Sequence, residues 1–259
     1  MTSGRLKGRK MAFIGSGAMG GAMIQSLLRA NEVDAQYITA SDPVAEQREE
    51  IQSQFGVNVT DDNVSAVHEA DIVVLSVKPQ VLPGVMPELR DKIKPQALVF
   101  SIVAGMPIST ISAGLNHPAV VRVMPNTPAQ IGEGMAVWTA SPDVIEVQRA
   151  QAQAILQAMG KEIYVKEENA LDMATAVSGT GPVYVFLLME ALVDAAVHLG
   201  FSRRDARTLV IQTVIGSAKF AEQSHLHLAQ LRNMVTSPGG TSAEAIYQME
   251  KGSMRTVLS

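Results

Sequence analysis

A stretch near the N-terminus has the spacing of a loop that binds a dinucleotide. It reads Gly15-Ser16-Gly17-Ala18-Met19-Gly20 and follows an apolar run at residues 10–15 that predicts a strand. Gly15 would permit the tight turn, Gly17 would let backbone amides approach a pyrophosphate, and Gly20 would let the next helix pack on the sheet. The N-terminus of that helix would face the phosphates. The loop therefore predicts NAD or NADP as cofactor, with the reduced form as hydride donor.

The end of the second expected strand, at residues 37–41, bears on which dinucleotide is bound. Ser41 and Asp42 lie where an acidic residue holds the adenosine ribose, about 20 residues beyond the glycines. A carboxylate there favours NAD, because it would repel a 2′-phosphate. Asp42 is equally suited to be an N-cap before Pro43, and Arg48 is near enough in sequence to reach a phosphate. The sequence leaves the choice between NAD and NADP open.

Further cofactor ligands are expected after the strands at residues 71–77 and 97–103. Open α/β sheets bind ligands at the carboxyl ends of their strands, and the residues there are Val77, Lys78, Pro79, Ala104 and Gly105. Lys78 would either neutralise the pyrophosphate or lie on the rim of the site. Residues 124–128 form a rigid turn in which two prolines bracket Asn126. The Asn126 amide would bind the nicotinamide region, or the turn is purely structural.

Two hydroxyl-rich stretches broken by glycine lie inside otherwise helical sequence, at residues 178–182 and 235–242. Interior glycine costs about 1 kcal/mol in a helix and proline about 3 kcal/mol, so we expect two turns that line a small polar pocket. The second stretch precedes a helical pattern at residues 243–251. Amides and hydroxyls at a helix N-terminus would bind a small carboxylate without Lys or Arg. The hydroxyls would alternatively be N-caps, although capping needs only one such residue.

Composition narrows the class of ligand. A formal net charge of −4 offers no basic surface for nucleic acid or an anionic membrane, so we expect a small-molecule substrate. The chain has no cysteine, which fits a reducing cytoplasm, and its polar N-terminus does not resemble a secretory signal. Glu190, Asp194 and His198 share one helical face, and His225 and His227 lie close in sequence. A solvated or paired stripe explains the first group better than a metal site, and a solvated loop explains the two histidines better, so no metal is predicted.

The pattern along the chain predicts two domains. Residues 1–166 alternate apolar strands with helices, which is typical of a Rossmann-type, doubly wound, mostly parallel sheet covered on both faces. Its last expected elements are strands at residues 119–124, 134–140 and 161–165, and a helix at 144–159 ended by Gly160. Residues 167–259 predict an all-α domain, broken only at the two hydroxyl-rich turns.

One helical stretch of the second domain, residues 183–201, is apolar on all sides. Its charged residues make a membrane span improbable. We expect it to be buried against a second subunit; the alternative is a central position in its own bundle.

Taken together, these motifs resemble the pyrroline-5-carboxylate reductase family, which carries out the last step of proline synthesis. The likeness covers nearly the whole chain and is strongest from Leu231 to Glu244; the other stretches that carry it are Gly15 to Gly20, Val77-Lys78-Pro79, Met124 to Pro128, and Ser178 to Pro182 with Tyr184 and Phe186. The resemblance implies an enzyme with a Rossmann domain and a helical dimerisation domain, a homodimer that often assembles further into a decamer. The cytoplasmic location that we expect rests on the absence of cysteine. It also implies reduction of (S)-1-pyrroline-5-carboxylate to L-proline, by hydride transfer from NAD(P)H to C5 of the imine.

The resemblance also assigns roles to residues. Thr175 would lie beside the substrate ring and the nicotinamide, and Asn63 and Ser41 on the adenosine side. The substrate carboxylate would be surrounded by a turn that in a dimer comes from the other subunit, made of Val235, Ser237, Gly239, Gly240, Thr241 and Ser242. We hypothesise that Thr175, with Ser178 near it, relays or orients the proton at the imine nitrogen. An imine that arrives protonated needs no metal.

The chain departs from the family pattern in three places. His225-Leu226-His227-Leu228 stands where a Glu-x-His-Pro turn is usual, Ser242 stands where Thr is commoner, and the helix after Arg255 is expected to be short.

Two other functions compete with the reductase. A 3-hydroxyacid dehydrogenase would need a lysine base such as Lys166, but the helix face that follows carries hydroxyls instead. A nucleotide-sensing protein without turnover is disfavoured by the intact hydroxyl turns.

Overall fold

The computed structural model describes residues 4–259, which divide into two compact units, one ending at Tyr184 and the other running from Val185 to Ser259. The first unit contains an eight-stranded sheet in the order β3-β2-β1-β4-β5-β6-β7-β8. The strands are β1 Met11–Ile14, β2 Ile38–Ser41, β3 Asn58–Thr60, β4 Ile72–Leu75, β5 Leu98–Ser101, β6 Val120–Met124, β7 Gly134–Ala140 and β8 Gly160–Tyr164. Neighbouring strands are parallel except β6 and β7. This confirms the predicted doubly wound, mostly parallel sheet.

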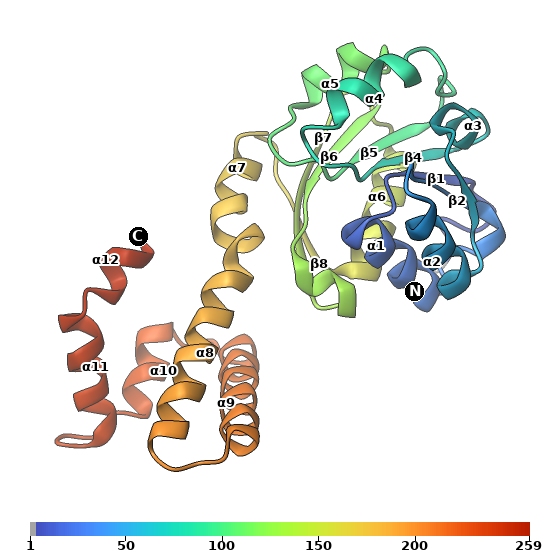
Figure 1. Ribbon diagram of the computed structural model, residues 1–259. Coiled ribbons are helices and arrows are strands. Elements are labelled where there is room, and N and C mark those ends of the chain that lie inside the picture. The colour runs from blue at the N-terminus through green and yellow to red at the C-terminus, as the bar shows by residue number, and fades with distance from the viewer. Residues whose placement is uncertain (1–3) are drawn as a thin grey trace. The chain divides into compact units, whose positions relative to one another are not determined.

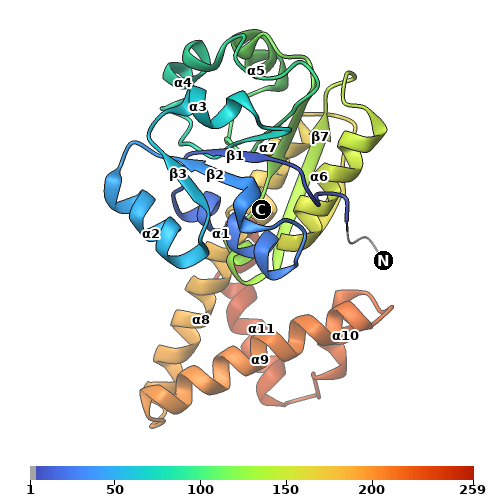
Figure 2. The same ribbon diagram turned by 90° about the vertical axis from the view of Figure 1, so that its right-hand side faces the viewer.

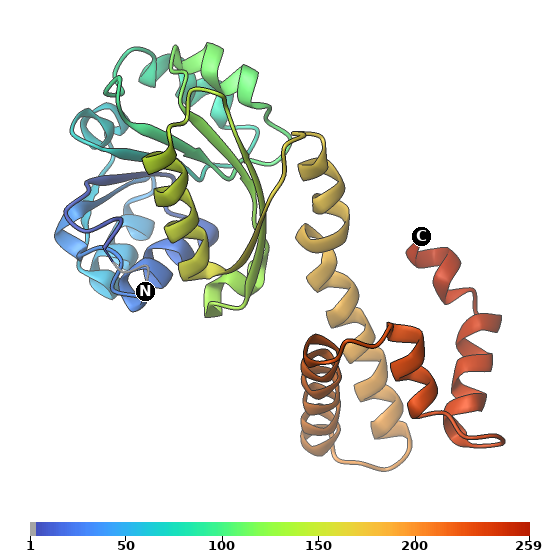
Figure 3. The same cartoon turned by 180° about the vertical axis from the view of Figure 1, so that it is seen from behind.

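Helices cover both faces of the sheet, and the central strands β1, β4 and β5 are fully buried. Their bounds are α1 Ala18–Arg29, α2 Ala45–Phe55, α3 Asn63–His68, α4 Leu82–Leu89, α5 Ile108–Leu115 and α6 Glu146–Met159, with short 3-10 turns η1 Ala35–Tyr37 and η2 Thr127–Ile131. One core contains apolar residues of α1, α2 and α6, and the other contains those of α3, α4 and α5. Figure 1 shows α4 and α5 on one side of the sheet and α1 and α2 on the other, and Figure 3 shows α6 lying along the sheet from behind.

The strand order reverses between β1 and β4, because β2 and β3 lie on one side of β1 and β4 to β8 on the other. Phe13 of β1 aligns with Ala40 of β2 and with Val74 of β4, so the carboxyl ends of these strands meet at one edge. Ligands of open α/β sheets bind at such a switch point.

The rest of the described chain is helical, as predicted. Its elements are α7 Ala170–Ala174, a π-helical turn η3 Thr175–Gly179, α8 Gly181–His198, α9 Arg203–Gln223, α10 Leu228–Met234, α11 Thr241–Lys251 and α12 Met254–Leu258. Figure 2 shows α8 to α11 following one another without a strand among them. The contact boundary at Tyr184 lies inside α8, whereas the strands end at Tyr164; the domain boundary after Lys166 stays a prediction.

Several local expectations were wrong. Residues 178–182 are not a turn, because the helix runs on through the π-helical turn η3. The helical part also breaks at Gly200, at residues 224–227 and at Gly252, in addition to the hydroxyl-rich turn before α11. Gly160 ends α6 as expected but also starts β8. The position of strand β3 was not predicted, since Asn58–Thr60 is short and has a polar residue at each end.

Candidate active site

The glycine loop joins β1 to α1 by contacts that only glycine allows. Gly15 has φ of +89°, and its N–H donates to the carbonyl of Ser41 at 2.8 Å. Its own carbonyl accepts a hydrogen bond of 2.6 Å from the Ser76 hydroxyl at the end of β4. A Cβ on Gly20 would lie 2.6 Å from that same carbonyl oxygen. Gly15 and Gly20 are therefore required by the packing of the protein itself.

Gly17 differs from its two neighbours in the motif. A Cβ at Gly17 would have no protein atom within 4 Å, and its φ of −61° suits any residue. Gly17 is also the N-cap of α1, without a side chain to accept from the first-turn amides. Those amides have no partner within the helix. The open space above Gly17 and the uncapped amides fit a pyrophosphate, which is the group the loop was predicted to bind.

Asp42 holds the glycine loop in place. Its Oδ2 accepts from the Ser16 N–H at 2.9 Å, and its Oδ1 accepts from the Val44 N–H at 3.0 Å. The expected N-cap role is wrong, because α2 begins at Ala45 and its N-cap is Val44. Arg48 lies beside Asp42, since its Nη1 donates to the Asp42 carbonyl at 2.7 Å. A cation therefore accompanies the carboxylate at the end of β2.

Ser41 and Asn63 meet at the end of β2. The Ser41 hydroxyl donates to Oδ1 of Asn63 at 2.8 Å, and Nδ2 of Asn63 donates to Glu88 at 3.0 Å. Because Ser41 is buried, its hydroxyl is fixed in place and orients the Asn63 side chain. This contact joins two of the residues predicted for the adenosine side.

The remaining predicted cofactor residues lie along the same edge of the sheet. Val77 follows β4 and packs against Gly15, where a Cβ would lie 2.9 Å from Val77 Cγ1. Lys78 is exposed, as are Ala104 and Gly105 after β5. Gly105 has φ of +68°, a value that favours glycine. The switch-point edge thus brings together residues from the ends of β1, β2, β4 and β5.

Asn126 is more constrained than the sequence suggested. Its Oδ1 accepts from the Met135 N–H at 2.8 Å, and its Nδ2 donates to the Ser178 carbonyl at 3.1 Å. One amide hydrogen is left for a ligand. The predicted contact with the nicotinamide stays a prediction, while the contact with the π-helical turn η3 was not foreseen.

The two predicted catalytic hydroxyls lie on η3. Thr175 Oγ1 donates to the Leu171 carbonyl at 2.9 Å, and Ser178 Oγ donates to the Ala174 carbonyl at 3.0 Å. Both side chains are half-buried. Because each proton is given to the helix, each hydroxyl presents lone pairs outward. Single π-helical turns occur often at functional sites.

A buried arginine that sequence reasoning missed anchors the start of this helix. Arg122 on β6 is 5% exposed, and its two terminal nitrogens each lie 2.9 Å from a carboxylate, of Glu168 and of Asp172. Glu168 also accepts from the Ile108 N–H at 2.8 Å. The signal was present in the sequence as a charge inside the apolar run Val120-Val121-Arg122-Val123.

The hydroxyl-rich turn before α11 belongs to the second unit. The Gly240 N–H donates to the Ser237 carbonyl at 3.0 Å, and Gly239 has φ of +68°. Gly240 is the N-cap of α11 and offers no side-chain cap, so the hydroxyls are not N-caps here. Thr241 and Ser242 form the first turn, and Val235 before it is 70% exposed. Like α1, α11 therefore begins at a glycine N-cap without a side-chain hydrogen bond to its first amides, which suits a carboxylate.

Two of the side chains considered for a metal site have other partners. Asp194 pairs with Arg203 at 3.0 Å, and His227 Nδ1 accepts from the Ala229 N–H at 3.1 Å. Among residues 4–259, no group of three His, Cys, Asp or Glu side chains lies close enough to hold a metal ion.

The chain matches two protein-family models and a set of similar proteins. The family model described as "Pyrroline-5-carboxylate reductase dimerisation" matches residues 168–259, and one described as "NADP oxidoreductase coenzyme F420-dependent" matches residues 10–105. Pyrroline-5-carboxylate reductase of Pseudomonas aeruginosa is 43% identical over 250 residues, covering 96% of this chain and 91% of that protein.

Two solved structures are similar over almost their full length. Pyrroline carboxylate reductase of Plasmodium falciparum, with NADP bound, has a TM-score of 0.89 and 30% identity, and the match covers 97% of this chain and 93% of that one. Pyrroline-5-carboxylate reductase of Coxiella burnetii has a TM-score of 0.87 and 35% identity, covering 96% and 93%.

Proposed function

The chain belongs to the pyrroline-5-carboxylate reductase family, and we propose that it reduces (S)-1-pyrroline-5-carboxylate to L-proline. The enzyme is an NAD(P)-dependent oxidoreductase. The observation that carries the proposal is the pair of uncapped, glycine-flanked helix N-termini, at α1 and at α11. One suits a pyrophosphate and the other a carboxylate, so a cofactor and an acidic substrate each have a site that needs no cationic side chain.

When bound, NAD(P)H supplies the hydride that adds to C5 of the protonated imine, giving NAD(P)⁺ and the ring amine. The chain's part is placement, because a correct approach of two bound reactants is worth about 7 to 11 kcal/mol of barrier. The cofactor would lie along the switch-point edge, held by loop residues 15–20, Ser41, Asp42, Asn63, Val77, Lys78, Pro79, Ala104, Gly105 and Asn126.

NADP is the cofactor that we propose for this chain. Both oxygens of Asp42 accept backbone N–H groups, which offsets part of the charge that would repel a 2′-phosphate. Arg48 lies at the same strand end and provides a cation. The matching NADP oxidoreductase family and the NADP-bound Plasmodium falciparum structure support this choice.

The substrate carboxylate would be held by the turn of Val235, Ser237, Gly239, Gly240, Thr241 and Ser242. Its uncapped amides at α11 supply donors for a carboxylate, and the hydroxyls of the first turn add further ones. Gly239 has φ of +68°, and no protein atom lies within 4 Å of the place that a Cβ would take. The backbone there can therefore approach a ligand without a side chain between them.

Thr175 would orient the proton at the ring nitrogen. Its own hydrogen is engaged with the Leu171 carbonyl, so its lone pairs are free to accept an N–H from the protonated imine. Ser178, one turn later, has the same arrangement through Ala174. The hypothesis predicts that Thr175→Ala slows turnover and that Thr175→Ser, which keeps the hydroxyl, does not.

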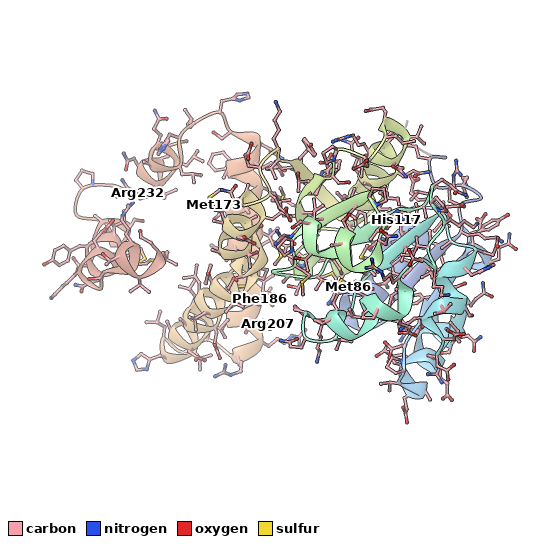
Figure 4. The ribbon with its side chains drawn as sticks, turned by 90° about the horizontal axis from the view of Figure 1, so that it is seen from above. Met86, His117, Met173, Phe186, Arg207 and Arg232 are labelled. Carbon is pink, nitrogen blue, oxygen red and sulfur yellow. The ribbon has the colours of Figure 1, made fainter. Side chains whose placement is uncertain are left out.

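The apolar surface of α8 is assigned to a partner subunit. Phe186 and Leu187 are 60% and 64% exposed, and Figure 4 labels Phe186 on this helix. By length and composition, residues 170–198 would also qualify as a membrane span, and none of the residues in the apolar window is buried within the chain. The matching dimerisation family favours a homodimer through the helical part. Assembly into decamers and a cytoplasmic location stay predictions.

An activity comparison tests the proposed function. Purified enzyme is given NADPH or NADH with pyrroline-5-carboxylate, and the oxidised cofactors with 3-hydroxyacids in parallel. We expect NAD(P)H oxidation that depends on pyrroline-5-carboxylate and no reduction of NAD(P)⁺ by 3-hydroxyacids. The reverse result would favour the hydroxyacid dehydrogenase, and activity with neither would favour a nucleotide-sensing protein.

A further inference from the structure

Alternate residues along β6 and the turn after it contact one helical segment. Arg122 binds Glu168 and Asp172, Met124 packs on Gly179, and Asn126 binds the Ser178 carbonyl. Successive side chains of an extended chain point to opposite sides, so residues two apart share a side. Asn126 is itself extended, with φ of −130° and ψ of 167°. One side of this strand and turn therefore runs along α7 and η3.

The Ser178 carbonyl needs a donor from outside its helix. In an α-helix, the carbonyl of residue 178 would accept from the N–H of residue 182, four positions on. Residue 182 is proline, which has no N–H. The next N–H, of Val183, donates to Thr180 at 2.9 Å. The Asn126 amide supplies the donor that the helix lacks.

The amide oxygen of Asn126 is engaged as well. Its Oδ1 accepts from the Met135 N–H in β7, so both polar atoms of the amide group are hydrogen-bonded. The same π-helical turn bonds the Thr180 N–H to the Thr175 carbonyl at 2.8 Å, which is the wide i to i+5 pattern. Movement of the Ser178 carbonyl would therefore displace the backbone of Thr175.

We infer that Asn126 is a positioning residue for the reduction: it captures the carbonyl that Pro182 leaves without a helical donor, and so holds the π-helical turn that presents the Thr175 hydroxyl. Arg122 fixes the start of the same helix, one turn before Thr175. The inference rests on the proposed function, because it gives the Thr175 hydroxyl its role at the ring nitrogen.

The test uses Asn126→Asp, which keeps the acceptor for Met135 and loses the donor to Ser178. Asn58→Asp is the matched control, because Asn58 also donates its amide to backbone carbonyls, of Gln36 and Ile38, on the distant strand β3. We expect kcat of Asn126→Asp to fall by about 10-fold to 100-fold, the scale of a misplaced reacting group. Asn58→Asp should keep kcat within about twofold.

A double variant separates positioning from a general loss of structure. If Asn126 acts through Thr175, the combined Asn126→Asp and Thr175→Ala variant should be no slower than the slower single variant. Losses in kcat that multiply, or a wild-type kcat for Asn126→Asp, would overturn the inference. Should Asn126→Asp not fold, Asn126→Ser takes its place with the same criteria.

The proposed function and this inference fail in distinguishable ways. A wild-type enzyme that does not oxidise NAD(P)H with pyrroline-5-carboxylate contradicts the function before any variant is made. An active wild type whose Asn126 variants keep full kcat contradicts the positioning role alone.

Discussion

Gly17 and Gly20 separate two reasons for glycine in the cofactor loop. A Cβ at Gly20 would overlap the Gly15 carbonyl, whereas a Cβ at Gly17 would meet no protein atom. We predict that Gly20→Ala lowers stability by about 1 to 3 kcal/mol, because the helix must shift. Gly17→Ala should melt like the wild type but bind NADPH at least about tenfold more weakly, since its methyl group enters the pyrophosphate space. Thermal unfolding and fluorescence titration would check both; unchanged NADPH binding by Gly17→Ala would contradict the cofactor's place above that residue.

Arg48 is the residue on which the NADP assignment depends. Its guanidinium lies at the end of β2 and is held by the Asp42 carbonyl and by Asp61 at 3.7 Å. Arg48→Gln should reduce kcat/KM for NADPH by about tenfold, because a charged hydrogen bond to the 2′-phosphate is lost. The value for NADH, which has no such phosphate, should change less than about twofold. Equal losses with both cofactors would show that Arg48 does not read the 2′-phosphate.

His117 gives the fold a measurable acid sensitivity. It is buried before β6, and its Nε2 lies 2.8 Å from the Ala97 carbonyl; Figure 4 labels it in the first unit. Burial lowers the pKa of His117 below its usual 6.5, despite the opposing hydrogen bond to Ala97. As the pH falls, His117 therefore takes up a proton in the unfolded chain at a higher pH than in the folded protein. The free energy of unfolding declines over this range.

We predict that His117→Gln, which keeps a donor for Ala97, reduces this decline. Urea unfolding at about pH 7.5 and pH 5.5 should show a shallower loss for the variant, by up to about 1.4 kcal/mol per pH unit. Identical pH slopes for the two proteins would contradict the assignment.

At the scale of elements, the contact between β6 and α7 is held by a charge cluster. Arg122 is buried, while Glu168 and Asp172 have side chains that are 33% and 66% exposed. Arg122→Met should cost about 2 to 3 kcal/mol, since it removes charged hydrogen bonds from a buried site. Asp172→Asn should cost less than about 1 kcal/mol, because Glu168 still pairs with Arg122. Chemical denaturation would measure both, and equal costs would show that the buried guanidinium is not the anchor.

The elements also show what local sequence can predict. The strand, glycine turn and helix at residues 11–29 were predictable because apolar runs, glycines and helical spacing lie next to one another. Asp42 was misjudged because its partner, the Ser16 amide, lies 26 residues away in sequence. Residues 178–182 looked like a turn because Gly and Pro disfavour helix, whereas the donor that lets the helix continue is Asn126. Helix propensities describe single residues, so they carry no information about hydrogen-bond partners that are distant in sequence.

At the scale of the whole molecule, the central prediction is the dimer. Phe186 lies on the apolar helix α8 and is 60% exposed within the chain. Phe186→Glu should weaken self-association by at least about 30-fold, because a charge would be buried at an apolar contact. Gln157→Glu, on the exposed side of α6, is the matched control and should leave association unchanged. Sedimentation without detergent measures both, and a wild type that needs detergent to stay dispersed would instead favour a membrane role for α8.

The order of motifs let the sequence predict the family and both parts of the chain. Because the carboxyl ends of parallel strands must meet at one edge, the sequence pattern alone named the residues that follow β4 and β5, which are Val77, Lys78, Pro79, Ala104 and Gly105. How the carboxylate turn meets the ring was not predictable in that way, since it belongs to a separate unit and is proposed to act in a dimer.

Following deuterium from the cofactor to the product tests direct hydride transfer. The enzyme would be given NADPH that carries deuterium at both C4 positions of the nicotinamide, together with unlabelled pyrroline-5-carboxylate, and the product examined by mass spectrometry and NMR. We expect L-proline that carries the label at C5. Proline without the label, or label released to water, would contradict direct transfer from the cofactor to the ring.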